Sequence, residues 1–208
     1  MTVPGIFITF EGGDGSGKST QAELLETWLT DASHTVIRTR EPGGTPVGDE
    51  LREIVLHSKG DIAPRAEALI FAASRAQHVA EKVRPALEAG HIVIMDRYLD
   101  SSVAYQGVAR GLGADAVRDI SLWATENLLP DLTIVLDLDE NTGRDRLNDS
   151  RTRYDRLEAE ERGFHERVRA AYLDLADAEP GRFIVLDASE PVDDIAAAIR
   201  TRVSALLT

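Results

Sequence analysis

The sequence contains no cysteine, which excludes a disulfide framework and a thiolate zinc site and fits a reducing compartment. It has no apolar run long enough to span a bilayer, and no basic segment followed by an apolar one that would predict a signal peptide. Basic side chains are few: the sequence has 23 Lys and Arg residues and 36 Asp and Glu residues, which gives a formal net charge of −13. Wrapping nucleic acid needs a net basic surface. We therefore expect a cytoplasmic protein with no membrane or nucleic-acid partner, in which local groups attract any anionic ligand.

The remaining composition is typical of one globular domain over residues 1–208, with 43% apolar and 28% charged residues and no repeat or Ser/Gly linker. Five short runs are nearly continuous in apolar character, as in strands buried on both faces of a sheet. They cover Ile6–Phe10, Thr35–Thr39, His91–Met95, Leu132–Leu136 and Phe183–Leu186. Helical spacing is found in Gln21–Thr30, Arg65–Glu88, Asp115–Leu128, Phe164–Ala178 and, after Pro191, Val192–Leu207. This alternation predicts an α/β fold of three layers, a five-stranded parallel sheet with helices on both faces.

A glycine-rich segment follows the first predicted strand and matches the phosphate-loop pattern G-x-x-x-x-G-K-[ST]. It reads Gly12, Gly13, Asp14, Gly15, Ser16, Gly17, Lys18, Ser19 and Thr20. Such a loop points backbone N–H groups at the phosphates of a nucleoside triphosphate, and the next helix adds its positive end. We expect Lys18 to reach the β- and γ-phosphates and the Ser19 hydroxyl to bind Mg²⁺.

The loop alone leaves the reaction open, but a GTPase switch is disfavoured. A guanine reader has the pattern N-K-x-D, and none of the three asparagines, Asn127, Asn141 and Asn148, is followed by lysine. The third predicted strand ends in Asp96 and Arg97. At the carboxyl edge of the sheet Asp96 could hold Mg²⁺ and Arg97 could bind a phosphate with two N–H groups.

Five arginines lie within thirteen residues after the fourth predicted strand, around a polar stretch Asn148-Asp149-Ser150; they are Arg144, Arg146, Arg151, Arg153 and Arg156. We expect a mobile lid at about residues 144–157, in place of a packed helix. Its arginines would close over the transferring phosphoryl group and stabilise the charge that develops there. A solvated helix face paired with neighbouring aspartates is the alternative.

Phe71 and Arg75 are four residues apart in a predicted helix and share a face. A flat ring beside a fork of donors suits stacking on a base and donation to its carbonyl oxygen. On spacing alone, a core-edge phenylalanine with a surface arginine is the more common reading.

Taken together, the motifs resemble those of the thymidylate kinase family, P-loop enzymes that phosphorylate dTMP with ATP. The resemblance covers nearly the whole chain and is carried by motifs in a fixed order. These are Phe10-Glu11-Gly12, Arg40-Glu41-Pro42-Gly43-Gly44-Thr45, Asp96-Arg97-Tyr98, Tyr105-Gln106-Gly107, Asp155-Arg156-Leu157-Glu158 and Leu186-Asp187-Ala188-Ser189.

The resemblance implies roles for individual residues. Phe71 would stack on thymine, Arg75 would donate to its O4, and Ser102 and Gln106 would border the base. Asp14 would bind the 3′-hydroxyl, Tyr105 would crowd the 2′ position, and Arg97 would hold the dTMP phosphate. Arg146 and the Asp187–Ser189 turn would flank adenine, and a homodimer is implied. Glu41, Pro42 and Asp155 complete the expected substrate site, and Ser19 and Asp96 the metal site.

Gly15 stands where some family members have a basic residue in the loop, so the resemblance implies that lid arginines supply that charge. Arg151 and Arg153 are the candidates, and the alignment inside the lid leaves their roles open. The implied reaction is in-line phosphoryl transfer from Mg-ATP to dTMP, giving dTDP. Two alternatives stay open: a kinase for another nucleoside monophosphate, and a nucleotide-binding regulator without turnover.

Overall fold

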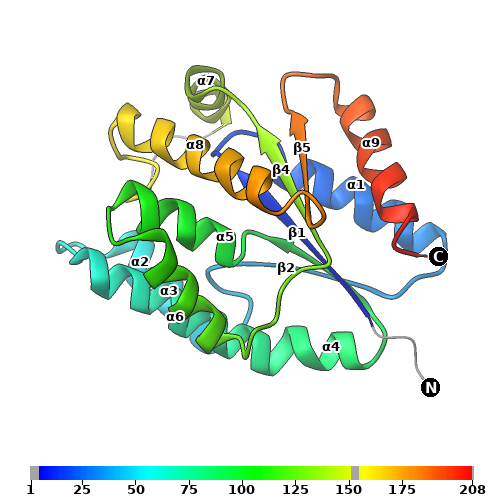
Figure 1. The fold of residues 1–208 in the computed structure, drawn as a ribbon, viewed down its shortest axis with the longest axis horizontal. Helices are drawn as coiled ribbons and strands as arrows, with labels where there is room; N and C mark the ends of the chain where they lie inside the picture. Colours follow the sequence, from blue (N-terminus) through cyan, green and yellow to red (C-terminus); the bar gives the residue numbers. More distant parts are fainter. Residues whose placement is uncertain (1–4, 151–154, 208) are drawn as a thin grey trace.

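The chain folds around one five-stranded parallel sheet with the strand order β2-β3-β1-β4-β5 (Figure 1). The structure is a computed structural model, and it describes residues 5–150 and 155–207, without the side chains of residues 149 and 150. The strands are β1 (Ile6–Gly12), β2 (Val36–Arg40), β3 (Ile92–Asp96), β4 (Leu132–Asp137) and β5 (Phe183–Asp187). Each lies within a residue or two of its predicted position, and the predicted fold class is confirmed.

Helices connect the strands and cover both faces of the sheet. The α-helices are α1 (Lys18–Asp31), α2 (Pro46–His57), α3 (Pro64–His78), α4 (Arg84–Glu88), α5 (Leu99–Ser102), α6 (Ala114–Ala124), α7 (Glu140–Ser150), α8 (Arg162–Ala178) and α9 (Val192–Ser204). Two π-helical segments are η1 (Val79–Val83), which joins α3 to α4, and η2 (Val103–Ala109), which continues α5. Among the described residues, no helix combines the length and apolar character needed to cross a membrane.

The sheet separates two layers of helices because alternate strand residues point to opposite faces. Ile8 and Phe10 of β1 pack with leucines of α1 and isoleucines of α9. Phe7 of the same strand points the other way and packs against η1, α4 and the α5–η2 segment. Helix α8 covers that second face beside β4.

Burial on both faces is confirmed for the central strands β1, β3 and β4. It is wrong for the edge strands, because β2 and β5 are only partly buried along most of their length. An edge strand has a neighbour on one side only, so fewer side chains of the adjoining layers cover it.

Three helical segments, α2, α5–η2 and α7, were not predicted from the sequence. In α2, Thr45 caps the first turn by accepting a hydrogen bond from the Gly48 N–H at 3.1 Å, and Pro46 opens the helix. The predicted Asp115–Leu128 helix ends early, at Ala124, because Glu126 and Asn127 take left-handed backbone conformations. Helix α7 also contradicts the expectation that the arginine-rich segment avoids a helix, since it includes Arg144 and Arg146.

A buried ion pair ties the sheet edge to the helical layer. Both carboxylate oxygens of Asp100 on α5 accept from Arg182, at 2.7 and 3.0 Å, and the Asp100 side chain is fully buried. Arg182, just before β5, also donates to Glu179 and to Thr133 on β4. The carboxylate therefore holds the segment after β3 against β4 and β5.

Replacing Asp100 with alanine is expected to lower the free energy of unfolding by roughly 3 kcal/mol, because Arg182 loses its buried partner. The control is Glu26→Ala, which removes the exposed Arg38–Glu26 pair and should cost less than about 1 kcal/mol. Urea unfolding followed by tryptophan fluorescence measures both. Equal losses in the two variants would contradict the assigned role of Asp100.

Candidate active site

A cavity of about 390 Å³ opens at the carboxyl edge of the sheet, where β1, β2 and β3 end. Parallel strands bring the residues that follow them to this edge, so segments far apart in sequence meet there. The predicted site residues that line it are Asp14, Gly15, Gly17, Lys18, Ser19, Thr20, Glu41, Pro42, Phe71, Asp96, Arg97, Ser102, Tyr105, Gln106, Arg146 and Asp155. Gly12, Gly13 and Ser16 complete the loop, and Arg75 lies buried behind the wall.

The phosphate loop leaves β1 and runs directly into α1. Gly12 has a φ of +130°, and a Cβ there would lie 2.4 Å from the Leu136 carbonyl oxygen of β4, so only glycine allows this exit from the sheet. Lys18 donates to the carbonyl oxygens of Gly12 and Gly13, at 3.2 and 2.7 Å. The buried Ser16 hydroxyl has no hydrogen-bond partner among the described residues. An orphaned donor inside such a loop fits a bound anion.

The fold of this chain requires glycine at position 15. Its φ is +75°, and a Cβ would lie 2.3 Å from the carbonyl oxygen of Gly143 on α7. A Cβ on Gly143 would in turn lie 2.7 Å from the Asp14 carbonyl oxygen. Two glycines thus let α7 approach the phosphate loop, and a longer side chain at position 15 has no room.

Arg97 lies between the loop and the helical layer, with a φ of +66° that is unusual outside glycine. Its Nη2 donates to Asp14 at 2.5 Å, and its Nη1 donates to the hydroxyls of Tyr172 and Ser101 at 3.2 and 3.3 Å. Burial alone would raise the pKa of Asp14, but the attraction of Arg97 and Lys18 outweighs it and lowers that pKa. Burial and the nearby Arg97 lower the pKa of Lys18 to about 8, against the attraction of the carboxylates around it. The two cations therefore stabilise the ionised form of Asp14 at the loop end of the cavity.

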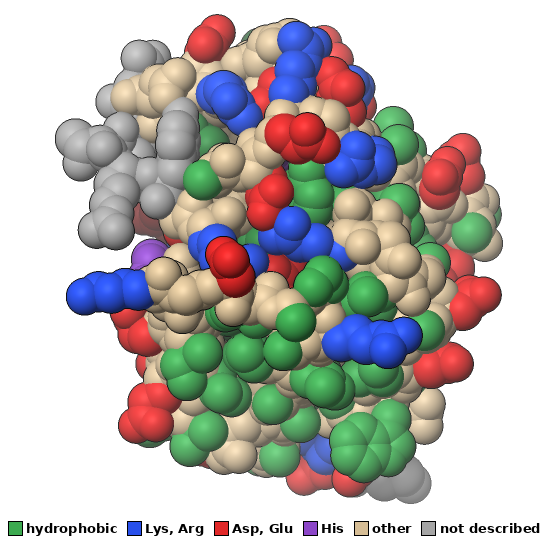
Figure 2. Space-filling view, turned by 90° about the vertical axis from the view of Figure 1, so that its left-hand side faces the viewer, with side chains coloured by type: hydrophobic (Ala, Val, Ile, Leu, Met, Phe, Trp, Pro, Cys, Tyr) green, Lys and Arg blue, Asp and Glu red, His purple; other side chains and the backbone are tan. Residues whose placement is uncertain are grey.

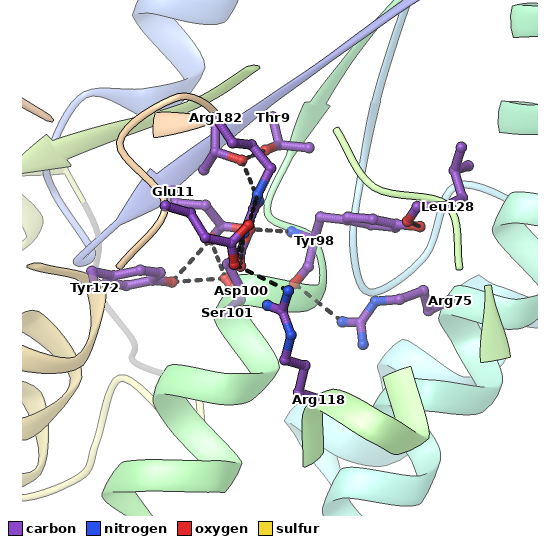
Figure 3. A network of polar contacts seen from close by, with 12 residues as sticks. Thr9, Glu11, Arg75, Tyr98, Asp100, Ser101, Arg118, Leu128, Tyr172 and Arg182 are labelled. Carbon is purple, nitrogen blue, oxygen red and sulfur yellow. Dashed lines mark hydrogen bonds and ion pairs between the residues drawn. The ribbon is translucent and has the colours of Figure 1, made fainter. Parts of the chain in front are cut away.

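Glu11, at the end of β1, contacts the Ser101 and Tyr172 hydroxyls that bind Arg97; Figure 3 shows Glu11 with these two side chains. Its Oε1 accepts from the Tyr98 N–H at 2.7 Å, and its Oε2 accepts from the Ser101 and Tyr172 hydroxyls at 2.5 and 3.0 Å. Because both hydroxyls donate hydrogen bonds to Glu11, their oxygens are left to accept from Arg97. Burial, followed by the nearby Asp100 carboxylate, raises the pKa of Glu11 to about 7.

Arg75 is almost fully buried and its guanidinium is held by four partners. Nε donates to Glu41 at 2.7 Å, and the Nη atoms donate to Ser121, Ser102 and the Tyr98 carbonyl oxygen at 3.0 to 3.2 Å. Sequence spacing alone favoured a surface arginine at this position, and the structure shows that reading to be wrong. Phe71, one turn earlier, faces the cavity with Tyr105 and Gln106.

Two side chains whose oxygens could bind a metal ion lie together at the end of β3. The Ser19 hydroxyl donates to the Asp96 carboxylate at 3.1 Å, and both line the cavity. A hydroxyl and a carboxylate are ligands that suit Mg²⁺ when phosphate oxygens and water complete its shell. Among the described residues no group of three or more His, Cys, Asp or Glu side chains forms a metal site.

On the far side of the loop, α7 reaches the segment after β5. Arg146 donates to the Ala188 carbonyl oxygen at 3.1 Å, beside a turn in which Asp187 accepts from the Ser189 N–H and hydroxyl. Asp155 begins the next described segment and caps its own turn by accepting from Leu157 and Glu158 N–H groups. Arg151 and Arg153, predicted as catalytic, lie outside the described residues.

Sequence reasoning missed several residues of this site. Arg40 and Arg52 line the cavity, and Arg52 donates to the Pro42 carbonyl oxygen at 2.9 Å. Arg40 was within reach of the sequence, because it ends β2 at the same edge as Asp96. Glu11 was visible as one charge in an apolar strand. Tyr172, on α8, had no local signal.

The chain is similar in sequence and structure to known proteins of one family. The family model described as Thymidylate kinase matches residues 10–199. A thymidylate kinase from Leifsonia xyli subsp. xyli is 70% identical over 96% of this chain and 94% of its own length. The chain belongs to the thymidylate kinase family.

Further thymidylate kinases support the assignment. The one from Clavibacter michiganensis subsp. michiganensis is 63% identical over 98% of this chain and 96% of its own length. The crystal structure of thymidylate kinase from Ehrlichia chaffeensis superposes with a TM-score of 0.78 at 30% identity, covering 97% of this chain and 99% of that one. Family membership confirms the predicted resemblance and the predicted enzyme class, a nucleotide kinase.

The raised pKa of Glu11 predicts a pH-dependent stability. The folded state holds this proton more tightly than the unfolded state, whose ordinary pKa is near 4.5. The resulting stabilisation is present below about pH 4.5 and is lost as the pH rises through about 7. Relative to Glu11→Gln, which does not titrate, the protein should therefore lose on the order of 2–3 kcal/mol of unfolding free energy between pH 4.5 and 8.

Urea unfolding of both proteins at pH 4.5, 6, 7 and 8 tests this, because other titrating groups cancel in the difference. A difference that stays constant across this range would contradict the raised pKa of Glu11.

Proposed function

We propose that this chain transfers the γ-phosphoryl group of ATP to dTMP, with Mg²⁺, in a direct in-line reaction that yields dTDP. One observation carries the proposal: a single cavity joins a phosphate loop to Arg97 and to a wall formed by Phe71, Tyr105 and Gln106. The loop suits the triphosphate and the wall suits a base, with Arg97 between them. This order matches a donor and an acceptor arranged end to end.

Base recognition would rest on stacking and on donors. Phe71 offers an aromatic face, and Arg75, held by Glu41 and Ser102 behind the wall, would donate to O4 of thymine. Cytosine carries an amine at that position and would face donor against donor. Tyr105 would crowd a 2′-hydroxyl, and Asp14 would accept from the 3′-hydroxyl.

Charge neutralisation would supply most of the catalysis. The second pKa of a phosphate monoester is near 6, so dTMP is already a dianion at neutral pH and needs no general base. Lys18 and the loop N–H groups would bind the donor phosphates, and Arg97 would hold the acceptor phosphate. Mg²⁺ held by Ser19 and Asp96 would neutralise charge on the donor phosphates. Arg151 and Arg153 are proposed to complete this set from the lid.

The adenine and lid assignments extend the same proposal. The Arg146 contact with the turn after β5 brings together the two groups that would flank adenine, and this supports an adenine site beside them. We treat residues 1–208 as one nucleoside monophosphate kinase domain with a lid at about 144–157, and we propose that it works in the cytoplasm. Closure of the lid would exclude water and so limit hydrolysis of ATP.

A homodimer is also proposed, on the basis of an apolar surface. Val47 and Ile54 of α2, Leu69 of α3 and Trp123 of α6 are about half to more than four-fifths exposed. Figure 2 views the α2–α3 side of the molecule, and hydrophobic side chains gather in the lower half of that view. Exposed apolar patches of this kind are typical of protein interfaces.

The function is tested by ADP release from Mg-ATP with dTMP, dUMP, dCMP, UMP, AMP and GMP. We expect dTMP to lead with dUMP second, because the two bases differ by one methyl group worth about 1–3 kcal/mol. Another preferred monophosphate would overturn the base assignment. ATP binding without turnover on any acceptor would instead indicate a regulator.

Lys18→Met and Arg97→Ala should fold and lose orders of magnitude in turnover.

The dimer is tested by sedimentation velocity of the wild type and of Leu69→Lys. We expect the wild type to sediment as a dimer and Leu69→Lys to shift toward monomer, since a charge would be buried in the interface. Val192→Lys is the matched control, because Val192 is 50% exposed but lies at the start of α9, on the opposite face of the sheet. A monomeric wild type would refute the dimer.

A further inference from the structure

Glu67 is a fully buried carboxylate on α3, one helical turn before Phe71. Three side chains surround it. Gln106 on η2 donates its amide to Oε1 at 2.8 Å, Arg110 donates to both oxygens at 3.3 Å, and Arg156 forms an ion pair at 2.6 Å. None of the motifs above includes Glu67, yet it links the base wall to Arg156, at the end of the proposed lid.

The contact with Glu67 fixes the orientation of the Gln106 amide, that is, whether its NH₂ group or its carbonyl oxygen faces Glu67. A carboxylate flanked by two guanidinium groups accepts hydrogen bonds, so it takes the NH₂ end of the amide. The carbonyl oxygen of Gln106 then points away from Glu67. Gln106 is 1% exposed and lines the cavity beside Phe71 and Tyr105, so its rotamer has little freedom.

We propose that Glu67 is a specificity-determining positioning residue: by holding the NH₂ group of Gln106, it turns the Gln106 carbonyl oxygen toward the base and selects pyrimidines that carry an N–H at N3. The inference deepens the proposed function and rests on it. Glu67 itself does not contact the base.

The chemistry of the bases gives this orientation its effect. Thymine and uracil have an N3–H donor next to the O4 acceptor. Cytosine has a lone pair at N3 next to an amine donor. A fixed acceptor opposite N3 would therefore bond to thymine and repel cytosine. At the neighbouring O4 the roles are reversed: Arg75 would be the donor and the base the acceptor. Buried polar groups left without a partner produce strong discrimination.

Glu67→Gln should weaken this selection. A glutamine has one acceptor oxygen, which Arg110 and Arg156 would take, so its NH₂ group would face Gln106. The Gln106 amide would then flip end for end in the same space and present its NH₂ group to the cavity, where it suits N3 of cytosine. We expect the ratio of kcat/KM for dTMP to that for dCMP to fall by a factor of about 10 to 100.

Two controls separate positioning from a structural role. Arg110→Gln removes one ion pair of Glu67 but keeps the Glu67–Gln106 hydrogen bond, so it should lower stability without changing the dTMP/dCMP ratio. In a Gln106→Leu background, Glu67→Gln should no longer change that ratio, because the amide through which it acts is gone. A ratio shifted equally by Arg110→Gln, or an effect of Glu67→Gln that persists without Gln106, would overturn the proposal.

Failure of the proposal and failure of the proposed function give different results. If the wild type does not phosphorylate dTMP, the function is wrong. If it does, and a folded Glu67→Gln keeps the wild-type ratio, only the role of Glu67 is wrong. Should Glu67→Gln fail to fold, Glu67→Asp replaces it. Aspartate keeps the charge beside the arginines but withdraws the carboxylate by one methylene from Gln106, so the ratio should again fall, and an unchanged ratio would refute the role.

Discussion

Buried carboxylates that bind neighbouring side chains hold the residues around the cavity in place. Glu11, Glu41, Glu67 and Asp100 are each at most 4% exposed, and a charge removed from water is costly unless hydrogen bonds and an opposite charge replace the solvent. Glu41, Glu67 and Asp100 meet that condition by pairing with arginines, whereas among the described residues Glu11 has hydrogen bonds without an ion pair, and burial raises its pKa to about 7. Glu41 holds Arg75, and Asp100 holds Arg182. Of the cavity-lining side chains, Gln106 is held by Glu67 and Ser101 by Glu11, so part of the lining is oriented by carboxylates that lie outside it.

Arg97 shows how this arrangement acts at a distance. Glu11 does not hydrogen-bond to Arg97, but it orients the Ser101 and Tyr172 hydroxyls that do. These three groups come from β1, α5 and α8, so the direction of one guanidinium depends on three elements packing correctly. Donors fixed in this way can stabilise charge without reorganising.

The backbone makes its own contribution through close approaches. Gly12 passes against β4, and Gly15 lies against Gly143 of α7, which brings the arginine-bearing helix to the phosphate loop. Helix α7 and the phosphate loop therefore touch through their main chains, where any side chain would separate them. Family membership makes the enzyme class plain, and these contacts describe how this chain builds its site.

The sequence by itself determined the fold class and most of the cavity lining. Near-continuous apolar runs mark central strands, and the phosphate loop, Asp96 and Arg97 directly follow strands, so the parallel topology brings them to one edge without further information. Only the tertiary structure decided the rest. The burial of Arg75 and the contacts of Glu11 and Glu67 depend on partners from 23 to 161 residues away in the chain. Local sequence carries no record of such partners, because hydrogen bonds and ion pairs form wherever packing brings their groups together.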